Sequence, residues 1–268
     1  IIVLSRNPKI LKKLPINLKN ISYIKSSIGK VKTLPKCNYI IYLSEDSSGK
    51  KLNLNKQKQH KINIKNCLSI VRRMKNIKFL YCSSGSVNDY KKRKKFFSNY
   101  KEKYAEMKIF TEKEVQALSR FKIKSSIARC YTFIGPWLAL NKHYAIGNFL
   151  SDALKKKFIT VKSNHNVIRS YMYADDMVFW LIKILQNSKI NCPIYNVGSD
   201  YKVSLNKVAE IIGRILNKPV KTLFLNNKKT DKYVPNIKKT EKDLKLKINY
   251  NLLESIILTI NRINEKTN

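Results

Sequence analysis

The chain has 268 residues, of which 55 are Lys or Arg and 17 are Asp or Glu, so its formal net charge is +38 at pH 7. A chain of this length can bury a sizeable core, as one large domain or as two closely joined ones. No apolar run approaches the length of a membrane-spanning helix, and no secretory signal is visible, so we expect no membrane partner.

The large positive charge by itself would indicate a nucleic acid or an anionic surface as partner. Lysine is nevertheless spread along the chain, and the motifs of known nucleic-acid-binding modules are absent from the sequence. We therefore expect no nucleic-acid partner, although a basic nucleic-acid-binding protein is kept as an alternative. The densest basic block, residues 91–95, is predicted to lie in a solvated loop near the mouth of the site described below.

Cysteine and histidine usage argues against disulfides and metals. The five cysteines are odd in number and have no C-x-x-C spacing, so we expect reduced, mostly buried thiols in a cytoplasmic protein. The three histidines are too scattered to indicate a metal site, and we expect none.

The first part of the chain contains short apolar segments that predict strands at residues 1–4, 21–25, 39–43 and 77–82, with a helix at 63–74. The segment 39–43 is apolar throughout, as in strands that a parallel sheet buries on both faces. The strand at 77–82 stops abruptly at Ser83-Ser84-Gly85-Ser86. Hydroxyl groups therefore follow the end of a buried strand.

A helix that carries Tyr104 and Lys108 is predicted after this turn. Positions i and i+4 lie on one face of a helix, so the phenol and the amine project side by side. An ammonium beside a phenol stabilises the phenolate and lowers the pKa of the tyrosine. Such a tyrosine can exchange a proton with a carbinol or carbonyl oxygen, which the serine hydroxyl at the strand end could hold.

The second part of the chain mixes strands and helices. We predict a strand at 123–130, helices at 143–154 and 177–185, and a closing helix at 252–263. Asp176 is expected to cap the helix at 177–185, and Ser204 is expected to cap an amphipathic helix whose apolar face includes Val208 and Ile212.

The order of these motifs resembles the extended short-chain dehydrogenase/reductase family, which includes nucleotide-sugar epimerases, dehydratases and ketoreductases. The matching segments are Ser83-Ser84-Gly85-Ser86, Tyr104-x-x-x-Lys108 with Glu112, the R-x-x-x-x-x-G-P segment from Arg129, the R-x-Y segment from Arg169, and Tyr195-Asn196-Val197-Gly198-Ser199. The resemblance implies an α/β fold, a Rossmann-type doubly wound parallel sheet with a smaller, mixed substrate-binding lobe. Residues 1–135 with 166–200 would form the dinucleotide-binding domain, and residues 136–165 with 201–268 the substrate lobe.

The resemblance also assigns roles to residues. Ser84, Tyr104 and Lys108 would be catalytic. Arg6 follows the first strand, where an arginine suits the ribose phosphate of NADP, and the expected cofactor is NADP or NAD. The cofactor contacts implied are Arg6, Ser44, Tyr104, Lys108 and Arg129, and the substrate contacts are Ser84, Ser86, Tyr144, Asn148 and Arg169.

Two features depart from the family pattern. The chain contains no G-x-x-G-x-x-G turn for the cofactor pyrophosphate, and we expect about thirty residues, one strand-turn-helix unit, to precede Ile1. Ser27 stands where the family usually has an aspartate for the adenine. A catalytically inactive, truncated remnant of the family is therefore an alternative interpretation.

The serine turn indicates which reaction to expect. Sugar 4,6-dehydratases of the family place an acid pair after the active-site Ser or Thr, whereas Gly85 and Ser86 follow Ser84 here. We therefore predict a 4-ketoreductase or an epimerase that acts on a nucleotide-linked deoxysugar for surface polysaccharide (O-antigen), with a 4,6-dehydratase as an alternative. The family resemblance also predicts a homodimer.

Overall fold

The computed structural model describes residues 1–7, 19–44, 54–93, 98–138, 140, 144–163, 165–223 and 230–265. The chain divides into two compact units. The first comprises Ile1–Ile127 with Leu185–Ile194, and the second Ala128–Ile184 with Tyr195–Asn268. Both units contain helices and strands, as predicted; the division into two binding domains at the residues given above stays a prediction.

Among the described residues, two sheets include strands of the first unit. Strands β1 (Ile2–Ser5) and β2 (Ser22–Lys25) form a parallel pair. A four-stranded sheet has the order β10-β5-β4-β3, formed by Ile194–Val197, Lys124–Cys130, Lys78–Ser84 and Tyr39–Tyr42 respectively. Strands β3 and β4 are parallel, with Tyr42 opposite Tyr81. A sheet with parallel neighbouring strands was expected from the apolar segments.

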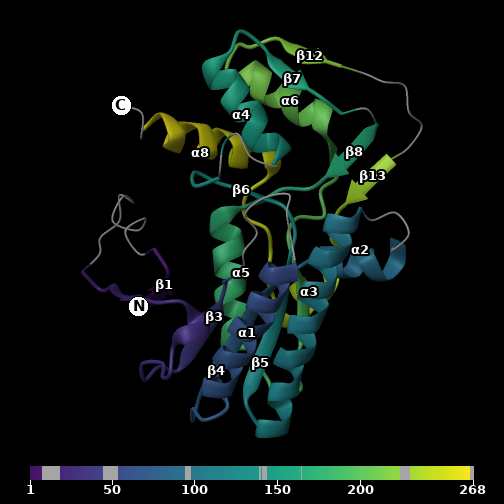
Figure 1. The fold of residues 1–268 in the computed structure, drawn as a ribbon. Coiled ribbons are helices and arrows are strands. Elements are labelled where there is room, and N and C mark those ends of the chain that lie inside the picture. The colour runs from purple at the N-terminus through teal and green to yellow at the C-terminus, as the bar shows by residue number, and fades with distance from the viewer. Residues whose placement is uncertain are drawn as a thin grey trace. The chain divides into compact units, whose positions relative to one another are not determined.

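The helices of the first unit are α1 (Leu54–Val71), α2 (Ser86–Arg93) and α3 (Asn99–Gln116), with two 3-10 segments, η2 (Ile28–Lys30) and η4 (Ala117–Phe121). Helices α1 and α3 lie side by side (Figure 1). A buried hydrogen bond of 2.7 Å between His60 Nε2 and Thr111 Oγ1 joins these two helices.

The core of the first unit explains why β4 is buried on both faces. Phe79, Leu80 and Tyr81 are almost fully enclosed, and the cluster around Phe79 and Tyr81 includes Ile64 from α1 and Val115 from α3. A strand covered on both sides reads as a continuous apolar run. The chain becomes polar only where β4 ends, at Ser83 and Ser84.

In the described part of the second unit, the strands form three small sheets. Their strands are β6 (Phe133–Ile134) with β9 (Met172–Tyr173), β7 (Ile159–Val161) with β12 (Val220–Thr222), and β8 (Asn166–Arg169) between β11 (Val203–Ser204) and β13 (Thr230–Tyr233). The helices that begin in this unit are α4 (Ala145–Lys155), α5 (Ala174–Gln186), α6 (Leu205–Ile215), α7 (Lys238–Leu244) and α8 (Leu252–Asn264).

Helices α4, α6 and α8 share one apolar core with β7. Leu150, Ile159, Val208, Ile212 and Ile256 are fully buried there. The predicted cap of α6 is confirmed, since the Ser204 side chain accepts a hydrogen bond from the Lys207 amide.

The predicted role of Asp176 as a helix cap is wrong. Helix α5 begins at Ala174, so Asp176 lies inside its first turn and is only 1% exposed. Its carboxylate accepts hydrogen bonds from the amides of Asn249 and Tyr250 and from the Asn249 side chain. Asp176 therefore anchors the segment that precedes α8, more than seventy residues away in sequence.

Two further predictions are corrected by the structure. Residues 91–93 belong to α2, whereas the sequence analysis placed the basic block 91–95 in a loop; residues 94 and 95 lie outside the described part of the chain. Helix α2 continues the chain directly from the serine turn, and its last described residues are the first three of the block. All five cysteines lie among the described residues, and Cys67 and Cys192 are buried whereas the other three are partly exposed, so the expectation of mostly buried thiols is wrong.

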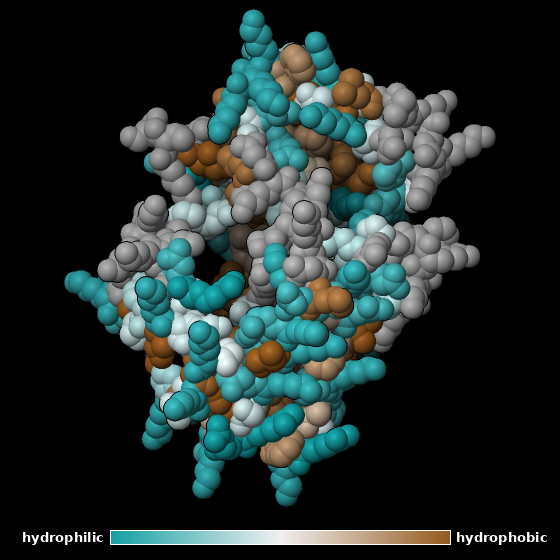
Figure 2. All heavy atoms as spheres, viewed as in Figure 1, coloured by the Kyte–Doolittle hydropathy of each residue, from teal (hydrophilic) through white to brown (hydrophobic). Residues whose placement is uncertain are grey.

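Hydrophilic side chains cover much of the described surface on the face shown in Figure 2, with hydrophobic side chains scattered among them. This distribution agrees with a lysine-rich composition spread along the chain. Among the described residues, no helix combines the length and apolarity needed to cross a membrane.

Candidate active site

The end of β4 and the middle of α3 carry the three residues predicted to be catalytic. Strand β4 supplies Ser84, and α3 supplies Tyr104 and Lys108. Helix α3 starts at a defined place, because Ser98 caps it by accepting a hydrogen bond from the Lys101 amide. The helix packs against β4 within the first unit (Figure 1), so the strand end and the helix face belong to one body.

Lys108 is held against the end of β4. Its side chain is only 4% exposed, and Nζ donates a hydrogen bond of 3.0 Å to the carbonyl oxygen of Cys82. The same nitrogen lies 5.1 Å from the centre of the Tyr81 ring and 5.7 Å from the centre of the Tyr104 ring. The ammonium is therefore beside the phenol ring of Tyr104, as the four-residue spacing predicted.

Ser84 and Ser86 lie where the strand turns into α2. Ser84 is buried, and its Oγ accepts a hydrogen bond of 3.2 Å from the Ser86 amide, which is the first residue of α2. The Ser86 hydroxyl is buried and has no hydrogen-bond partner within the described structure. A buried hydroxyl without a partner is costly, so this atom is suited to a polar ligand.

Glu112 is a buried residue for which the sequence analysis gave no role. It is 4% exposed, and its Oε1 accepts a hydrogen bond of 2.6 Å from Ser83 Oγ, which is equally buried. Its position four residues after Lys108 was the available signal, since residues at i and i+4 share a helix face. Ser83 thus contacts Glu112, whereas the role predicted at this strand end belongs to Ser84.

The other predicted cofactor contacts are described by their place in the fold. Arg6 follows β1 directly and Ser44 lies two residues after β3, and both are exposed. Arg129 is half-buried near the end of β5. Their roles remain predictions.

The remaining predicted substrate contacts belong to the second unit. Tyr144 is the N-cap residue of α4 and is 50% exposed, while Asn148 lies in the first turn of that helix. Arg169, at the end of β8, forms an ion pair of 2.8 Å with Asp231 on β13, and its guanidinium also donates to the backbone carbonyl of Asp231. Asp231 was not anticipated from sequence, because the pairing of β8 with β13 decides the contact.

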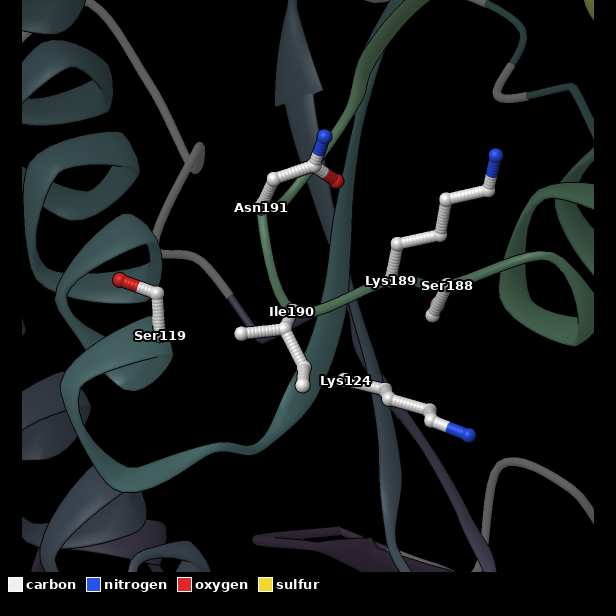
Figure 3. Close-up of a pocket in the computed structure, with 6 residues that line it drawn as sticks. All are labelled: Ser119, Lys124, Ser188, Lys189, Ile190 and Asn191. Atoms are coloured by element: carbon white, nitrogen blue, oxygen red, sulfur yellow. The ribbon is translucent and has the colours of Figure 1, made fainter.

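Figure 3 shows a shallow surface pocket in the first unit, around the start of β5. It is lined by Ser119, Lys124, Ser188, Lys189, Ile190 and Asn191. Backbone hydrogen bonds between Ser125 and Lys189 hold its two walls together. None of the predicted site residues lines it, so it is not the candidate site.

The comparison with protein families matches residues 5–198 to the NAD dependent epimerase/dehydratase family. UDP-glucuronic acid decarboxylase 1 of Arabidopsis thaliana is 24% identical over 136 residues, which are 50% of this chain and 31% of that protein. UDP-glucuronic acid decarboxylase 3 of the same plant is 27% identical over 109 residues, or 41% of this chain and 31% of that protein. The matches thus span about a third of the length of these curated relatives.

Solved structures match nearly the whole chain. UDP-N-acetylglucosamine 4-epimerase of Methanobrevibacter ruminantium, in complex with UDP-N-acetylmuramic acid, has a TM-score of 0.82 at 16% identity, covering 99% of this chain and 90% of that one. UDP-glucuronic acid 4-epimerase of Bacillus cereus, in complex with NAD, has a TM-score of 0.76 at 18% identity, covering 91% and 81%. These likenesses confirm the predicted Rossmann-type α/β fold.

Proposed function

The chain belongs to the NAD dependent epimerase/dehydratase family, and on that premise we propose that it is an oxidoreductase of nucleotide sugars that uses NAD or NADP. The observation that carries the proposal is the position of Lys108, buried against the end of β4 with its ammonium beside the ring of Tyr104. The family assignment confirms the sequence-based resemblance at this level. The finer resemblance to deoxysugar reductases such as CDP-abequose synthase stays a prediction.

Tyr104 is the proposed acid/base. The neighbouring ammonium of Lys108 stabilises a phenolate, so Tyr104 can take the proton from a sugar hydroxyl and return it to the carbonyl oxygen in the reverse direction. Ser84, at the strand end, is proposed to donate a hydrogen bond to the same sugar oxygen. The hydrogen bond to the Cys82 carbonyl holds the ammonium of Lys108 in place beside Tyr104.

The residues at this site fit the nicotinamide end of a dinucleotide. A buried lysine, a phenol and a buried serine hydroxyl without a partner supply hydrogen bonds that a ribose and a sugar oxygen can use. The bound nicotinamide would accept or donate the hydride. Lys108 would hold the ribose, while Arg6 favours NADP over NAD, as an arginine after this strand does.

Epimerisation or ketone reduction fits the turn better than elimination of water. The chain places Gly85 and Ser86 after Ser84, so the acid pair of 4,6-dehydratases is missing from that turn. The relatives named above are decarboxylases and epimerases of UDP-linked sugars. We therefore choose UDP-linked sugars as the first substrates to test; a deoxysugar of surface polysaccharide and a homodimer remain predictions.

Arg169 is the proposed contact for the nucleotide diphosphate. A guanidinium can hold two oxygens of a diphosphate at once, and the ion pair with Asp231 fixes its orientation beforehand. Tyr144 and Asn148, at the start of α4, are proposed to contact the same group, because helix N-termini favour anions.

The test incubates the purified protein, wild type and variants, with NAD or NADP and with UDP-glucose or UDP-glucuronic acid. The expected result is nicotinamide reduction or sugar conversion that Tyr104→Phe reduces by about 10²- to 10⁴-fold, the usual contribution of a general acid/base. Tyr100→Phe, one turn earlier on α3, is the matched control and should retain turnover within about twofold. Equal turnover in Tyr104→Phe and wild type would refute the assignment.

A further inference from the structure

Two hydrogen bonds, one buried and one partly buried and one helical turn apart on α3, hold the last residues of β4. Lys108 Nζ donates to the Cys82 carbonyl at 3.0 Å, and Ser83 Oγ donates to Glu112 Oε1 at 2.6 Å. The first bond involves a proposed functional residue. The second involves Glu112, which is too far from Tyr104 to act on the same oxygen, since eight helical residues span about 12 Å.

The carboxylate of Glu112 is buried, and Ser83 at the end of β4 donates a hydrogen bond to it. A charged side chain that is 4% exposed carries a large desolvation cost, and an apolar side chain of similar volume often fills such a place at least as well. The bond to Ser83 is short, as expected when the acceptor is charged. Such a directional bond specifies the position of the strand end along the helix.

The residues on either side of Ser83 show what depends on the position of the strand end along α3. Cys82 supplies the carbonyl that holds Lys108, and Ser84 supplies the hydroxyl proposed to orient the substrate. Ser84 Oγ also accepts the amide hydrogen bond that begins α2. A shift of the strand end along α3 would therefore move the carbonyl and the hydroxyl together, relative to Lys108 and Tyr104.

We propose that Glu112 is a positioning residue: by accepting the Ser83 hydrogen bond, it fixes the end of β4 against α3 and keeps Ser84 and Lys108 in their working arrangement. This inference rests on the proposed function for its kinetic consequence. Its structural consequence, a fixed strand end, is independent of which sugar is used.

The kinetic test compares Glu112→Leu with Glu112→Gln. Leucine has a similar volume but no acceptor, whereas the glutamine oxygen still accepts from Ser83. A misplacement of about 1 Å can cost about 10²-fold in rate. We expect Glu112→Leu to lower kcat by about 10- to 100-fold with KM changed less than about threefold, and Glu112→Gln to restore kcat to within about fivefold of wild type.

Two further variants complete this test. Ser83→Ala removes the donor, and should lower kcat as Glu112→Leu does, with little additional loss in the double variant. Glu114→Ala is the control, because Glu114 is on the same helix but half-buried in a surface pair with Arg72, and its kcat should not change. Equal losses in Glu112→Leu and Glu112→Gln, or a strictly additive double variant, would overturn the proposal.

Hydrogen exchange tests the same inference without turnover. The amides of Gly85 and Ser86 should exchange at least about 10-fold faster in Glu112→Leu and in Ser83→Ala, whereas those of Phe79–Tyr81 should keep wild-type rates. Unchanged exchange at the turn in a folded variant would overturn the inference. If the wild-type protein converts no nucleotide sugar, the proposed function fails, while exchange still decides the role of Glu112; if Glu112→Leu does not fold, Ser83→Ala provides the same comparison.

Discussion

Lys108 and Cys82 are joined by a hydrogen bond of 3.0 Å, from the ammonium of a helix residue to a backbone carbonyl at the end of the neighbouring strand. The lysine is almost fully buried, so the bond satisfies part of the hydrogen-bonding capacity of a costly group. Because a backbone carbonyl cannot rotate away, the bond sets where the ammonium stands relative to Tyr104.

Replacing Lys108 should therefore remove activity without removing the fold of α3. In Lys108→Met, the stabilising charge beside Tyr104 is lost, and we expect kcat to fall by about 10²- to 10⁴-fold in a nicotinamide absorbance assay. Lys113→Met, at an exposed position of the same helix, is the control for the loss of one positive charge. Turnover of Lys108→Met within about threefold of Lys113→Met would contradict the role of Lys108.

The sequence predicted this part of the molecule well because the signals are local. The apolar segment at 77–82 and the serines after it indicated a buried strand with a polar end, and four-residue spacing placed Tyr104 and Lys108 together. The bond between Ser83 and Glu112 could not be predicted, because it depends on how far along the helix the strand ends. That position depends on how β4 and α3 come together in the folded chain, which the local sequence pattern does not encode.

Asp176 illustrates the same limit in the second unit. An acidic residue before an apolar helical segment is a good cap, and local pattern gave no reason to extend the helix back to Ala174. The actual partners, Asn249 and Tyr250, come from a segment more than seventy residues later. Only the folded chain brings their amides to the carboxylate.

Asp176 should consequently be important for stability. In Asp176→Ala, three donors in partly buried hydrogen bonds lose their acceptor, and we expect the free energy of unfolding to fall by about 3 kcal/mol in urea denaturation. Asp175→Ala is the matched control, because Asp175 is the preceding residue in the same first turn but is exposed. Equal losses for the two variants would indicate a helix-end charge effect rather than the buried contacts.

Gly213 should not tolerate alanine, although it lies within a helix. Gly→Ala usually stabilises a helix by about 1 kcal/mol. In α6, however, a Cβ at this position would come within 2.6 Å of the Lys218 carbonyl oxygen, which is backbone and cannot easily move. We therefore expect Gly213→Ala to lower the free energy of unfolding by about 1–3 kcal/mol, by the cost of overpacking.

Gly29→Ala provides the comparison for Gly213→Ala. A Cβ at Gly29 would collide with the Asn63 side-chain oxygen, but that side chain can rotate away. The free energy of unfolding of Gly29→Ala, measured in urea, should change by less than about 1 kcal/mol. Similar effects of the two substitutions would show that the backbone near Lys218 moves more easily than its packing suggests.

Cys67 should make the protein less stable at alkaline pH. Burial raises the pKa of its thiol from 9.0 to about 12. Between pH 9 and pH 12 the unfolded chain loses the thiol proton, whereas the folded chain keeps it. The contribution of the thiol to the free energy of unfolding is therefore complete below pH 9 and is lost as the pH rises towards 12. The loss is at most about 1.4 kcal/mol per pH unit. Urea denaturation from pH 7 to 11 should show the difference between wild type and Cys67→Ala shrinking above pH 9 and constant below pH 8. A difference that stays constant to pH 11 would mean that the buried thiol ionises without unfolding the chain.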